Sequence, residues 1–209
     1  MVCRDGKRAY DHQARYVAEE LGFFAEIGEN RRYRGGAYGN VLLSRLPIRY
    51  IGNHDLSVRG RERRGCLHAD VCLGGGSRLH LFNIHLGTAV YERRIQAREL
   101  FRRRLFTDPH LVGNRIILGD FNEWRPDLPS QLLNSQFESA HSHLRTARAH
   151  TFPGLLPLLA LDYIYFDRGL ELRDVTIHRS RGALVASDHL PLIADFALPA
   201  APARDPKPC

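Results

Sequence analysis

The chain has 209 residues, of which 44% are hydrophobic and 25% are charged, and its formal net charge is +7. These proportions exclude a disordered or membrane-spanning class and suit one domain with a substantial core. The longest apolar stretch, Leu155 to Leu161, contains Pro157 and is far shorter than the roughly 20 residues of a membrane-spanning helix. We expect one domain over residues 1–198, without a transmembrane segment, and a Pro- and Ala-rich tail over 199–209.

The positive charge is carried almost entirely by arginine, with 30 Lys and Arg against 23 Asp and Glu. Such an excess is compatible with a polyanionic or phosphate-bearing partner. Solvated protein faces are the simpler interpretation of each arginine cluster taken separately, so charge alone does not identify a nuclease. The clusters lie at residues 31–34, 61–64 and 93–104.

The N-terminus begins with charged residues and lacks the apolar run and small-residue cleavage site of a secretory signal, which predicts a cytoplasmic protein. The four cysteines show no C-x-x-C spacing. This arrangement indicates neither a zinc knuckle nor a disulfide framework, and we expect reduced thiols.

The first expected element is an amphipathic helix over 12–21, with apolar side chains at helical spacing and Gly22 as its C-cap. Short apolar runs separated by turn residues then predict strands. Helices are expected over 91–106 and 126–133, on either side of a short apolar strand. Many strands with a few helices between them predict an α/β (α+β) layered fold in which helices cover sheets. The expected strands are 41–43, 48–51, 66–73, 79–84, 115–118, 161–166, 170–177 and 191–196.

Four segments share one layout, in which an apolar strand runs out into a polar residue capable of metal or phosphate chemistry. Sites in layered α/β folds are commonly assembled from strand ends and the loops that follow them. We therefore expect the four segments to meet. They are Phe82-Asn83-Ile84-His85, Ile117-Leu118-Gly119-Asp120-Phe121-Asn122, Leu161-Asp162-Tyr163-Ile164 and Ala186-Ser187-Asp188-His189-Leu190-Pro191.

Each of these polar residues also has a simpler structural explanation. Asp120 after Gly119 is compatible with a turn, Asn122 with a helix N-cap, and His85 with a hydrogen-bonded strand end. Their joint occurrence in this order favours a common site over four separate coincidences.

Taken together, the motifs resemble the endonuclease/exonuclease/phosphatase superfamily, which contains pancreatic deoxyribonuclease. The resemblance covers nearly the whole chain, from the first helix to Phe196, and it is specific for the superfamily but not for one substrate. It is carried by Asn83-Ile84-His85-Leu86, Gly119-Asp120-Phe121-Asn122, Leu161-Asp162-Tyr163-Ile164 and Ser187-Asp188-His189-Leu190-Pro191, with further similarity at Tyr38 to Ile48 and Thr151-Phe152-Pro153.

The resemblance implies a four-layer sandwich of two mostly antiparallel β-sheets flanked by helices, and hydrolysis of a phosphate ester with Mg²⁺ or Mn²⁺. Hard cations of this kind take carboxylate oxygens, keep several waters and are held by few protein ligands. Asp188 is the first ligand candidate, with Asp120 beside the same metal or the attacking water.

The resemblance also pairs Asp162 with His189. A carboxylate beside a histidine fixes its tautomer and stabilises the imidazolium, so Asp162 orients His189 as an acid/base or phosphate-stabilising group. Asn122 is expected to hold the attacking water or the phosphate, and His85 to donate to a phosphoryl or leaving-group oxygen. Whether Asp120 or His189 is the base stays open. Asn40, Arg45 and Arg64 are weaker candidates that the sequence does not assign to the site.

The chain departs from the family pattern at its start, where the first strands and the glutamate that binds the metal are expected but not found. A start assigned too far downstream or a re-purposed gene are both compatible with this.

We expect a metal-dependent phosphodiesterase or phosphatase acting on a small or lipid-linked phosphate, with nucleic acid as the closest competing substrate. The alternative is a catalytically impaired remnant that binds phosphate-bearing ligands. The oligomeric state stays open.

Overall fold

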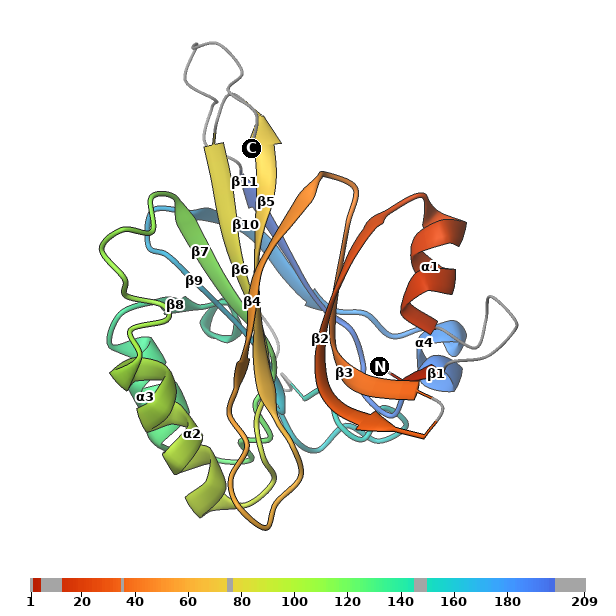
Figure 1. Ribbon diagram of the computed structural model, residues 1–209. Coiled ribbons are helices and arrows are strands. Elements are labelled where there is room, and N and C mark those ends of the chain that lie inside the picture. The colour runs from red at the N-terminus through yellow and green to blue at the C-terminus, as the bar shows by residue number, and fades with distance from the viewer. Residues whose placement is uncertain (1, 5–12, 35, 75–76, 145–149, 198–209) are drawn as a thin grey trace.

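The structure is a computed structural model that describes residues 2–4, 13–34, 36–74, 77–144 and 150–197 (Figure 1). Its helices are α1 (Gln13–Leu21), α2 (Val90–Arg102), α3 (Leu128–Asn134), α4 (Arg181–Ala186) and the 3₁₀ turn η2 (Ala140–His143). Its strands are β1 (Val2–Arg4), β2 (Phe24–Tyr33), β3 (Gly36–Ser44), β4 (Ile48–Asp55), β5 (Gly65–Gly74), β6 (Ser77–His85), β7 (Asn114–Asp120), β8 (Glu138–Ser139), β9 (Asp162–Phe166), β10 (Glu171–Ile177) and β11 (Leu192–Ala197).

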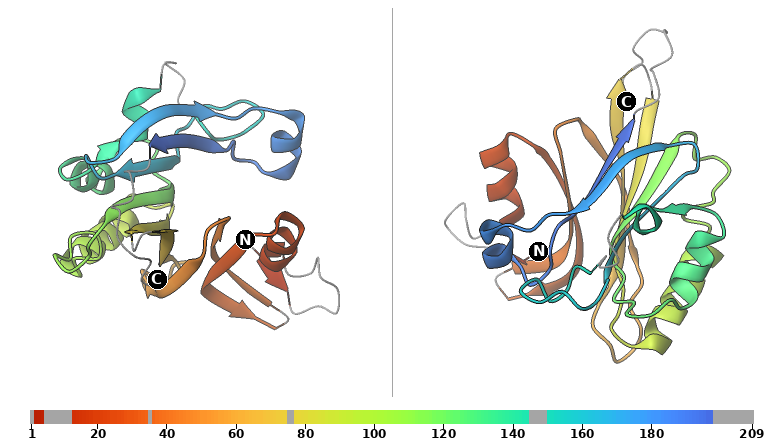
Figure 2. Two further views of the ribbon diagram at one scale, coloured as in Figure 1. Left: turned by 90° about the horizontal axis from the view of Figure 1, so that it is seen from above. Right: turned by 180° about the vertical axis from the view of Figure 1, so that it is seen from behind.

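The elements form four layers. The central sheet has six strands in the order β4-β5-β6-β7-β9-β8, and α2 and α3 cover one of its faces (Figures 1 and 2). The other face is opposed by a three-stranded sheet, β1-β3-β2, and a two-stranded sheet, β10-β11, with α1 and α4 outside them. The prediction of a layered α/β fold with helices outside the sheets is confirmed. The layer opposite the six-stranded sheet consists of two separate sheets within the described residues.

Packing on the two faces of the six-stranded sheet follows the alternation of side chains along its strands. Phe82 and Ile84 of β6 are fully buried on the side of α2, where the Phe82 ring meets the edge of Phe106 with 5.0 Å between centroids. On the other side, Leu67 and Ala69 of β5 pack with Leu42 of β3. The central strands are therefore covered on both faces, which holds their ends in fixed positions.

Two further expectations have clear outcomes. Cys66 is a free, buried thiol, whereas Cys72 is disulfide-bonded, so the prediction of reduced thiols is wrong for Cys72. None of the helices in the described ranges is long and apolar enough to cross a membrane. The expected tail over 199–209 lies outside the described residues.

The close approach of β6 and β7 depends on Gly119. These strands are parallel, and Gly119 lies opposite Ile84 with a φ of +136°, a conformation that side chains disfavour. A Cβ at position 119 would lie 1.9 Å from the carbonyl oxygen of Ile84. Only glycine therefore allows β7 to deliver Asp120 at this distance from β6.

We predict that Gly119→Ala destabilises the protein by roughly 3 kcal/mol or more, because the backbone of β6 has to move. The matched control is Gly60→Ala, which also has a positive φ (+77°) but has nothing within 4 Å of the added Cβ. The control is expected to cost about 1 kcal/mol through backbone strain alone. Urea unfolding of both variants measures the difference, and equal losses would contradict the role of the Ile84 contact.

Candidate active site

Three of the expected site residues lie in one row across adjacent strands. His85 ends β6, Asp120 ends β7, and the register pairs them; Asp162 begins the antiparallel strand β9 and is paired with Asp120. The His85 Nε2 and Asp120 Oδ2 atoms are 3.3 Å apart. Strand pairing alone thus brings these three side chains to one edge of the sheet.

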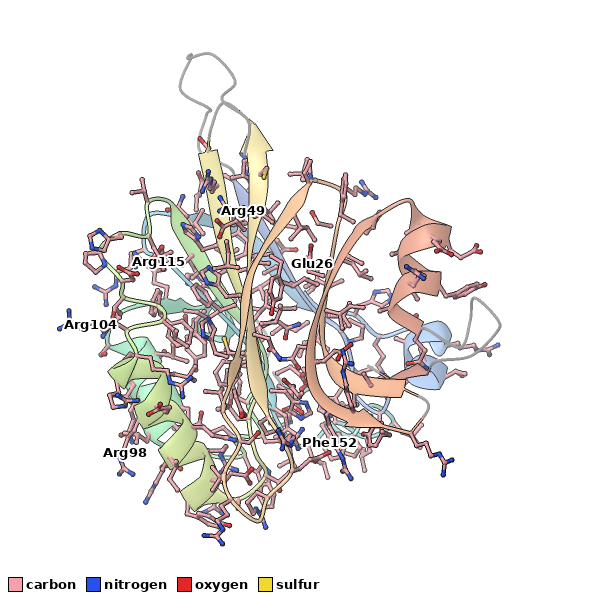
Figure 3. The ribbon with its side chains drawn as sticks, in the orientation of Figure 1. Glu26, Arg49, Arg98, Arg104, Arg115 and Phe152 are labelled. Atoms are coloured by element: carbon pink, nitrogen blue, oxygen red, sulfur yellow. The ribbon has the colours of Figure 1, made fainter. Side chains whose placement is uncertain are left out.

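His189 comes to this edge from the loop before β11. Its Nδ1 lies 2.7 Å from Oδ2 of Asp162, so the imidazole donates to the carboxylate as expected from the sequence. The ring also lies 4.9 Å from that of Phe152, which Figure 3 shows at the lower end of the sheet. The Asp162–His189 pair is therefore a well-formed contact between segments that are distant in sequence.

Thr151 holds the loop that carries His189 in place through hydrogen bonds. Its hydroxyl accepts from the backbone N–H groups of Leu161 (3.3 Å) and Asp162 (3.4 Å), and its carbonyl accepts from Leu190 N–H (2.8 Å). Thr151 itself is fully buried. These bonds link the start of β9 to the residue after His189, which explains why the Thr151-Phe152-Pro153 motif accompanies the motifs around Asp162 and His189.

Asn122 fixes the loop after β7. It has a φ of +50°, a left-handed conformation that asparagine tolerates better than most residues. Its backbone N–H donates to Asp120 Oδ1 (2.8 Å), and its side-chain amide donates to the Leu86 carbonyl (2.9 Å) and lies 3.3 Å from Asp120 Oδ2. In this structure Asn122 therefore orients the Asp120 carboxylate.

Asp188 lies at the rim of the site. It is exposed, and its backbone carbonyl accepts a hydrogen bond from Gly154 N–H at 2.7 Å. Its carboxylate is close enough to contribute to the raised pKa of His189, behind the larger effects of Asp162 and Asp120. The strand ends and the loops after β7 and before β11 thus bring five expected residues together, and Asp188 lies on their open side. The five are His85, Asp120, Asn122, Asp162 and His189.

Two residues that sequence reasoning left unassigned reach the site through His85. Arg64 is buried, and its NH1 lies 2.7 Å from Nε2 and 3.0 Å from Nδ1 of His85. The hydroxyl of Tyr38 lies 3.3 Å from Nδ1 of the same ring. Gly65 pairs with His85, so the residue before β5 arrives at the same edge as the end of β6. The sequence analysis considered polar residues only where strands end. Arg64 and Tyr38 lie near the starts of β5 and β3, which run antiparallel to their neighbours, so it did not assign them to the site.

Asn40 has a structural position beside this edge. Its side-chain amide donates to the carbonyls of Gly65 (3.0 Å) and Asn83 (2.8 Å), which ties β3 to β5 and β6. The side-chain amide nitrogen of Asn40 therefore has its hydrogen-bond partners within the fold.

Burial and neighbouring charges shift the three central groups in different directions. Burial raises the pKa of Asp120 to about 6, with a smaller raising effect of Asp162, against the lowering effect of the Asn122 backbone hydrogen bond. Burial and the charge of Arg64 lower the pKa of His85 to about 3, so this imidazole is neutral at physiological pH. The hydrogen bond to Asp162 raises the pKa of His189 above its ordinary value. A neutral His85 and a His189 of raised pKa therefore flank one poorly solvated carboxylate.

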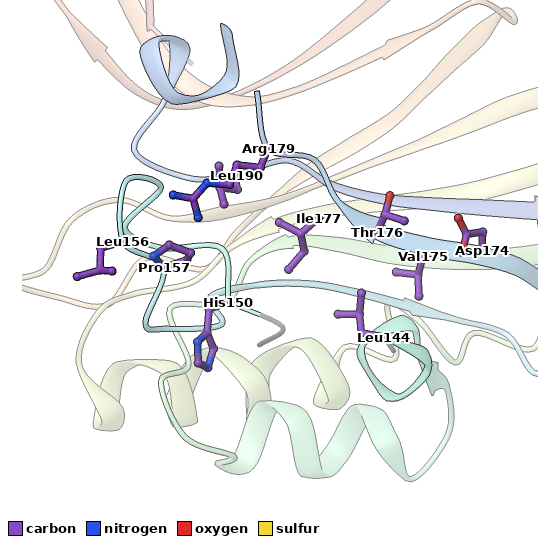
Figure 4. A pocket seen from close by; sticks show the side chains of 10 residues that line it. All are labelled: Leu144, His150, Leu156, Pro157, Asp174, Val175, Thr176, Ile177, Arg179 and Leu190. Atoms are coloured by element: carbon purple, nitrogen blue, oxygen red, sulfur yellow. The ribbon is translucent and has the colours of Figure 1, made fainter. Parts of the chain in front are cut away.

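A shallow pocket of about 330 Å³ opens at Asp162 and His189, bordered by Gly119 and Ser187. A second pocket, of about 480 Å³, lies on the other side of Leu190 and is mostly apolar, with Arg179 and His150 among its polar residues (Figure 4). Of the site residues, Asp162 and His189 line the first pocket. The second offers adjoining space that reacting groups do not line.

The fold and the strand-end row define a layered α/β protein with a polar site at one edge of its central sheet. The model of the Endonuclease/Exonuclease/phosphatase family matches residues 4–189, so the chain belongs to this family, whose members are hydrolases that act on phosphate esters.

The chain is also similar in sequence or in fold to several known proteins. The chain is 36% identical over 192 residues to the uncharacterized protein YbhP of Escherichia coli (strain K12), a match that covers 88% of this chain and 72% of YbhP. A functionally unknown conserved protein from Enterococcus faecalis V583 has a similar structure, with a TM-score of 0.72 and 20% identity over 88% of this chain and 81% of that one. The human nocturnin catalytic domain with a bound sulfate anion has a TM-score of 0.69 and 17% identity over 87% and 74% of the two chains.

We predict that Asp120→Asn stabilises the metal-free protein at neutral pH. Because burial raises the pKa of Asp120 from 3.8 to about 6, its favourable contribution is present below about pH 4 and is lost as the pH rises through 6, by up to about 3 kcal/mol. Asparagine has no charge to desolvate. The melting temperature in EDTA should therefore favour the variant at about pH 7.5 and not at about pH 4. Exposed Asp188→Asn is the control, with little effect at either pH; a less stable Asp120→Asn at neutral pH would contradict the prediction.

We predict that Asp162→Asn lowers the pKa of His189, because the hydrogen bond to Asp162 is the largest cause of its rise and burial opposes it. An NMR titration of the imidazole signals measures the change. Asp167→Asn is the matched control, since Asp167 follows the opposite end of β9 and pairs with Arg115 at 2.8 Å. An unchanged His189 titration in Asp162→Asn would refute the assigned pairing.

Proposed function

We propose that the protein is a divalent-metal-dependent hydrolase of phosphate esters, and that reaction takes place at the edge formed by His85, Asp120 and Asp162. The observation that carries the proposal is the Asp162–His189 pair next to the desolvated carboxylate of Asp120. An imidazole and a carboxylate that both have raised pKa values and lie side by side are the arrangement that general acid–base catalysis needs.

The residues present suit Mg²⁺ or Mn²⁺. Asp120 is mostly buried and its neighbouring imidazole His85 is neutral, and burial raises the pKa of Asp120 more than the nearby His189 and Arg64 lower it. Asp188 adds an exposed carboxylate on the open side. A hard cation held by one or two carboxylates and water would relieve the desolvation of Asp120. Bound there, it would neutralise charge on the phosphoryl oxygens.

His189 and Asp120 take complementary roles in the proposal. His189, whose protonated form the hydrogen bond to Asp162 favours, donates a proton or a hydrogen bond to the phosphoryl or leaving-group oxygen. Asp120 accepts a hydrogen bond from the attacking water, and Asn122 keeps its carboxylate aimed at that water. The hydrogen bond from Asp162 favours the protonated form of His189, which suits it to the donor role and leaves Asp120 as the proposed proton acceptor.

Arg64 and His85 form the proposed anion-binding side. A guanidinium group only donates hydrogen bonds, so one ring nitrogen of His85 must accept from Arg64. An imidazole with an accepting nitrogen is neutral. The Nε atom of Arg64 is buried without a hydrogen-bond partner. A buried arginine with an unused donor favours a phosphoryl group beside it. The sulfate bound to nocturnin is a phosphate-like anion on the same fold.

A small or lipid-linked phosphate is the preferred substrate class. Arg102 and Arg103 are paired with Glu99 on α2, and Arg94 is paired with Asp127. Arg98 and Arg104 point outward on the helix side of the molecule (Figure 3). This cluster therefore gives little support to a nucleic-acid track at the strand ends. A nuclease would show a steep loss of affinity with salt, whereas a small-phosphate hydrolase would not.

We predict Mg²⁺-dependent hydrolysis of a generic phosphodiester or phosphomonoester by the 209-residue chain. His189→Ala should lower kcat by about 10²–10⁴-fold, since it removes the proton donor, and EDTA should abolish turnover. His143→Ala is the control, because this histidine is half exposed, lies outside the strand-end row and is paired with Glu138 at 3.8 Å. Phosphate-ligand binding without turnover in excess Mg²⁺ would instead support the binding-remnant alternative.

A further inference from the structure

A second cluster of metal-ligating side chains lies in the middle of the central sheet, on the face covered by α2. His68 and Asp70 come from β5 and His80 from β6, and all three are at least 95% buried. His80 precedes His85 by five residues in the same strand, about 16 Å away from the strand-end row. This cluster is therefore separate from the proposed active site.

The three side chains converge on one point. His80 Nδ1 lies 2.6 Å and His68 Nε2 lies 3.5 Å from the same oxygen, Asp70 Oδ1. The three potential ligand atoms lie within 4.8 Å of one another, and theirs is the single group of three or more such residues found in the described part of the chain. Ligand atoms around tetrahedral Zn²⁺ are about 3.3 Å apart, given metal–ligand distances near 2.0 Å. The cluster reaches this spacing with small side-chain movements.

His68 supplies an independent indication of a ligand. Its side chain is 94% buried, and its Nε2 is directed toward Asp70 Oδ1 at 3.5 Å, where it makes no well-formed hydrogen bond. A buried polar atom without a partner is costly, and native structures usually satisfy it with water or an ion. The ring is held in place by stacking on Phe82, with 4.1 Å between centroids. The nitrogen is thus preoriented toward the point where the other two ligands meet.

The opposite nitrogen of His80 is already engaged. His80 Nε2 lies 3.2 Å from the carbonyl oxygen of Val112, in the segment that crosses back after α2. Metal-binding histidines commonly donate their second N–H to a backbone carbonyl, which directs the other nitrogen at the metal. The same contact would transmit metal binding to this segment.

We propose that His68 Nε2, Asp70 Oδ1 and His80 Nδ1 bind one transition-metal ion of the zinc class, with water completing the coordination. Two imidazoles and one carboxylate match Zn²⁺ or Co²⁺, whereas Mg²⁺ prefers oxygen ligands alone. The ion replaces the proton shared by His80 and Asp70, so one proton is released on binding. Its role is structural: it joins β5, β6 and the segment around Val112.

Two neighbouring groups bear on the site. Arg78 NH1 lies 3.9 Å from Asp70 Oδ2, so it neutralises the other carboxylate oxygen and leaves Oδ1 for the ion. His54 stacks near His68 with 6.3 Å between ring centroids, and its Nε2 is also buried without a partner. The competing interpretation is a metal-free network in which His80 and Asp70 share a proton and His68 serves only in packing.

The test is a Co²⁺ titration of chelator-stripped protein in excess Mg²⁺, followed by visible absorption and by displacement with Zn²⁺. We expect one equivalent of Co²⁺ with tetrahedral absorption bands, displaced by one equivalent of Zn²⁺. His68→Phe keeps the ring stack on Phe82 and removes the nitrogen, and it should weaken Co²⁺ binding at least tenfold. His189→Ala, which removes the competing imidazole of the active site, should leave the bands unchanged.

Absence of tetrahedral bands in the wild-type protein, or equal Co²⁺ affinity in His68→Phe, would overturn the proposal in favour of the metal-free network. If His68→Phe does not fold, X-ray absorption of zinc-loaded His189→Ala decides the matter. Two imidazole nitrogens around zinc support the site, and oxygen-only coordination overturns it. Neither result depends on whether the protein hydrolyses phosphate esters.

Discussion

The candidate site depends on the parallel pairing of β6 with β7, at a separation that Gly119 permits. This pairing sets Asp120 opposite His85, and the antiparallel strand β9 then sets Asp162 opposite Asp120. Backbone hydrogen bonds fix such a register to a whole residue, since a slip by one position would turn each side chain to the other face. The row is therefore as rigid as the sheet, and the loops supply only Asn122 and His189.

Charge at this edge is arranged by burial more than by ion pairing. Asp120 is desolvated, burial and Arg64 keep His85 neutral, and the hydrogen bond to Asp162 raises the pKa of His189. These effects leave a carboxylate that a hard cation would stabilise. The cluster of His68, Asp70 and His80, on the helix-covered face of the same sheet, offers nitrogen ligands instead. Donor chemistry thus separates the two proposed metal sites within one sheet.

Most of the fold was predictable because buried strands and amphipathic helices leave a local pattern. The expected strands at 79–84, 115–118 and 161–166 correspond to β6, β7 and β9. β2 was missed because Phe24–Tyr33 is largely exposed and polar, so it carries no apolar alternation. The helix expected over 91–106 ends at Arg102, and Arg104 adopts a left-handed conformation with a φ of +52°. Apolar side chains keep their helical spacing beyond Arg102, although the backbone leaves the helix there.

The sequence by itself determined the layered α/β class and the family, because apolar periodicity and the polar residues at strand ends are local features. It also indicated the contact between Asp162 and His189, through the family's motifs. Only the tertiary structure decided that Arg64 and Tyr38 meet His85, that burial raises the pKa of Asp120, and that His68, Asp70 and His80 converge. These features arise from strand register and from the exclusion of water, which depend on residues far apart in the chain and leave no local pattern.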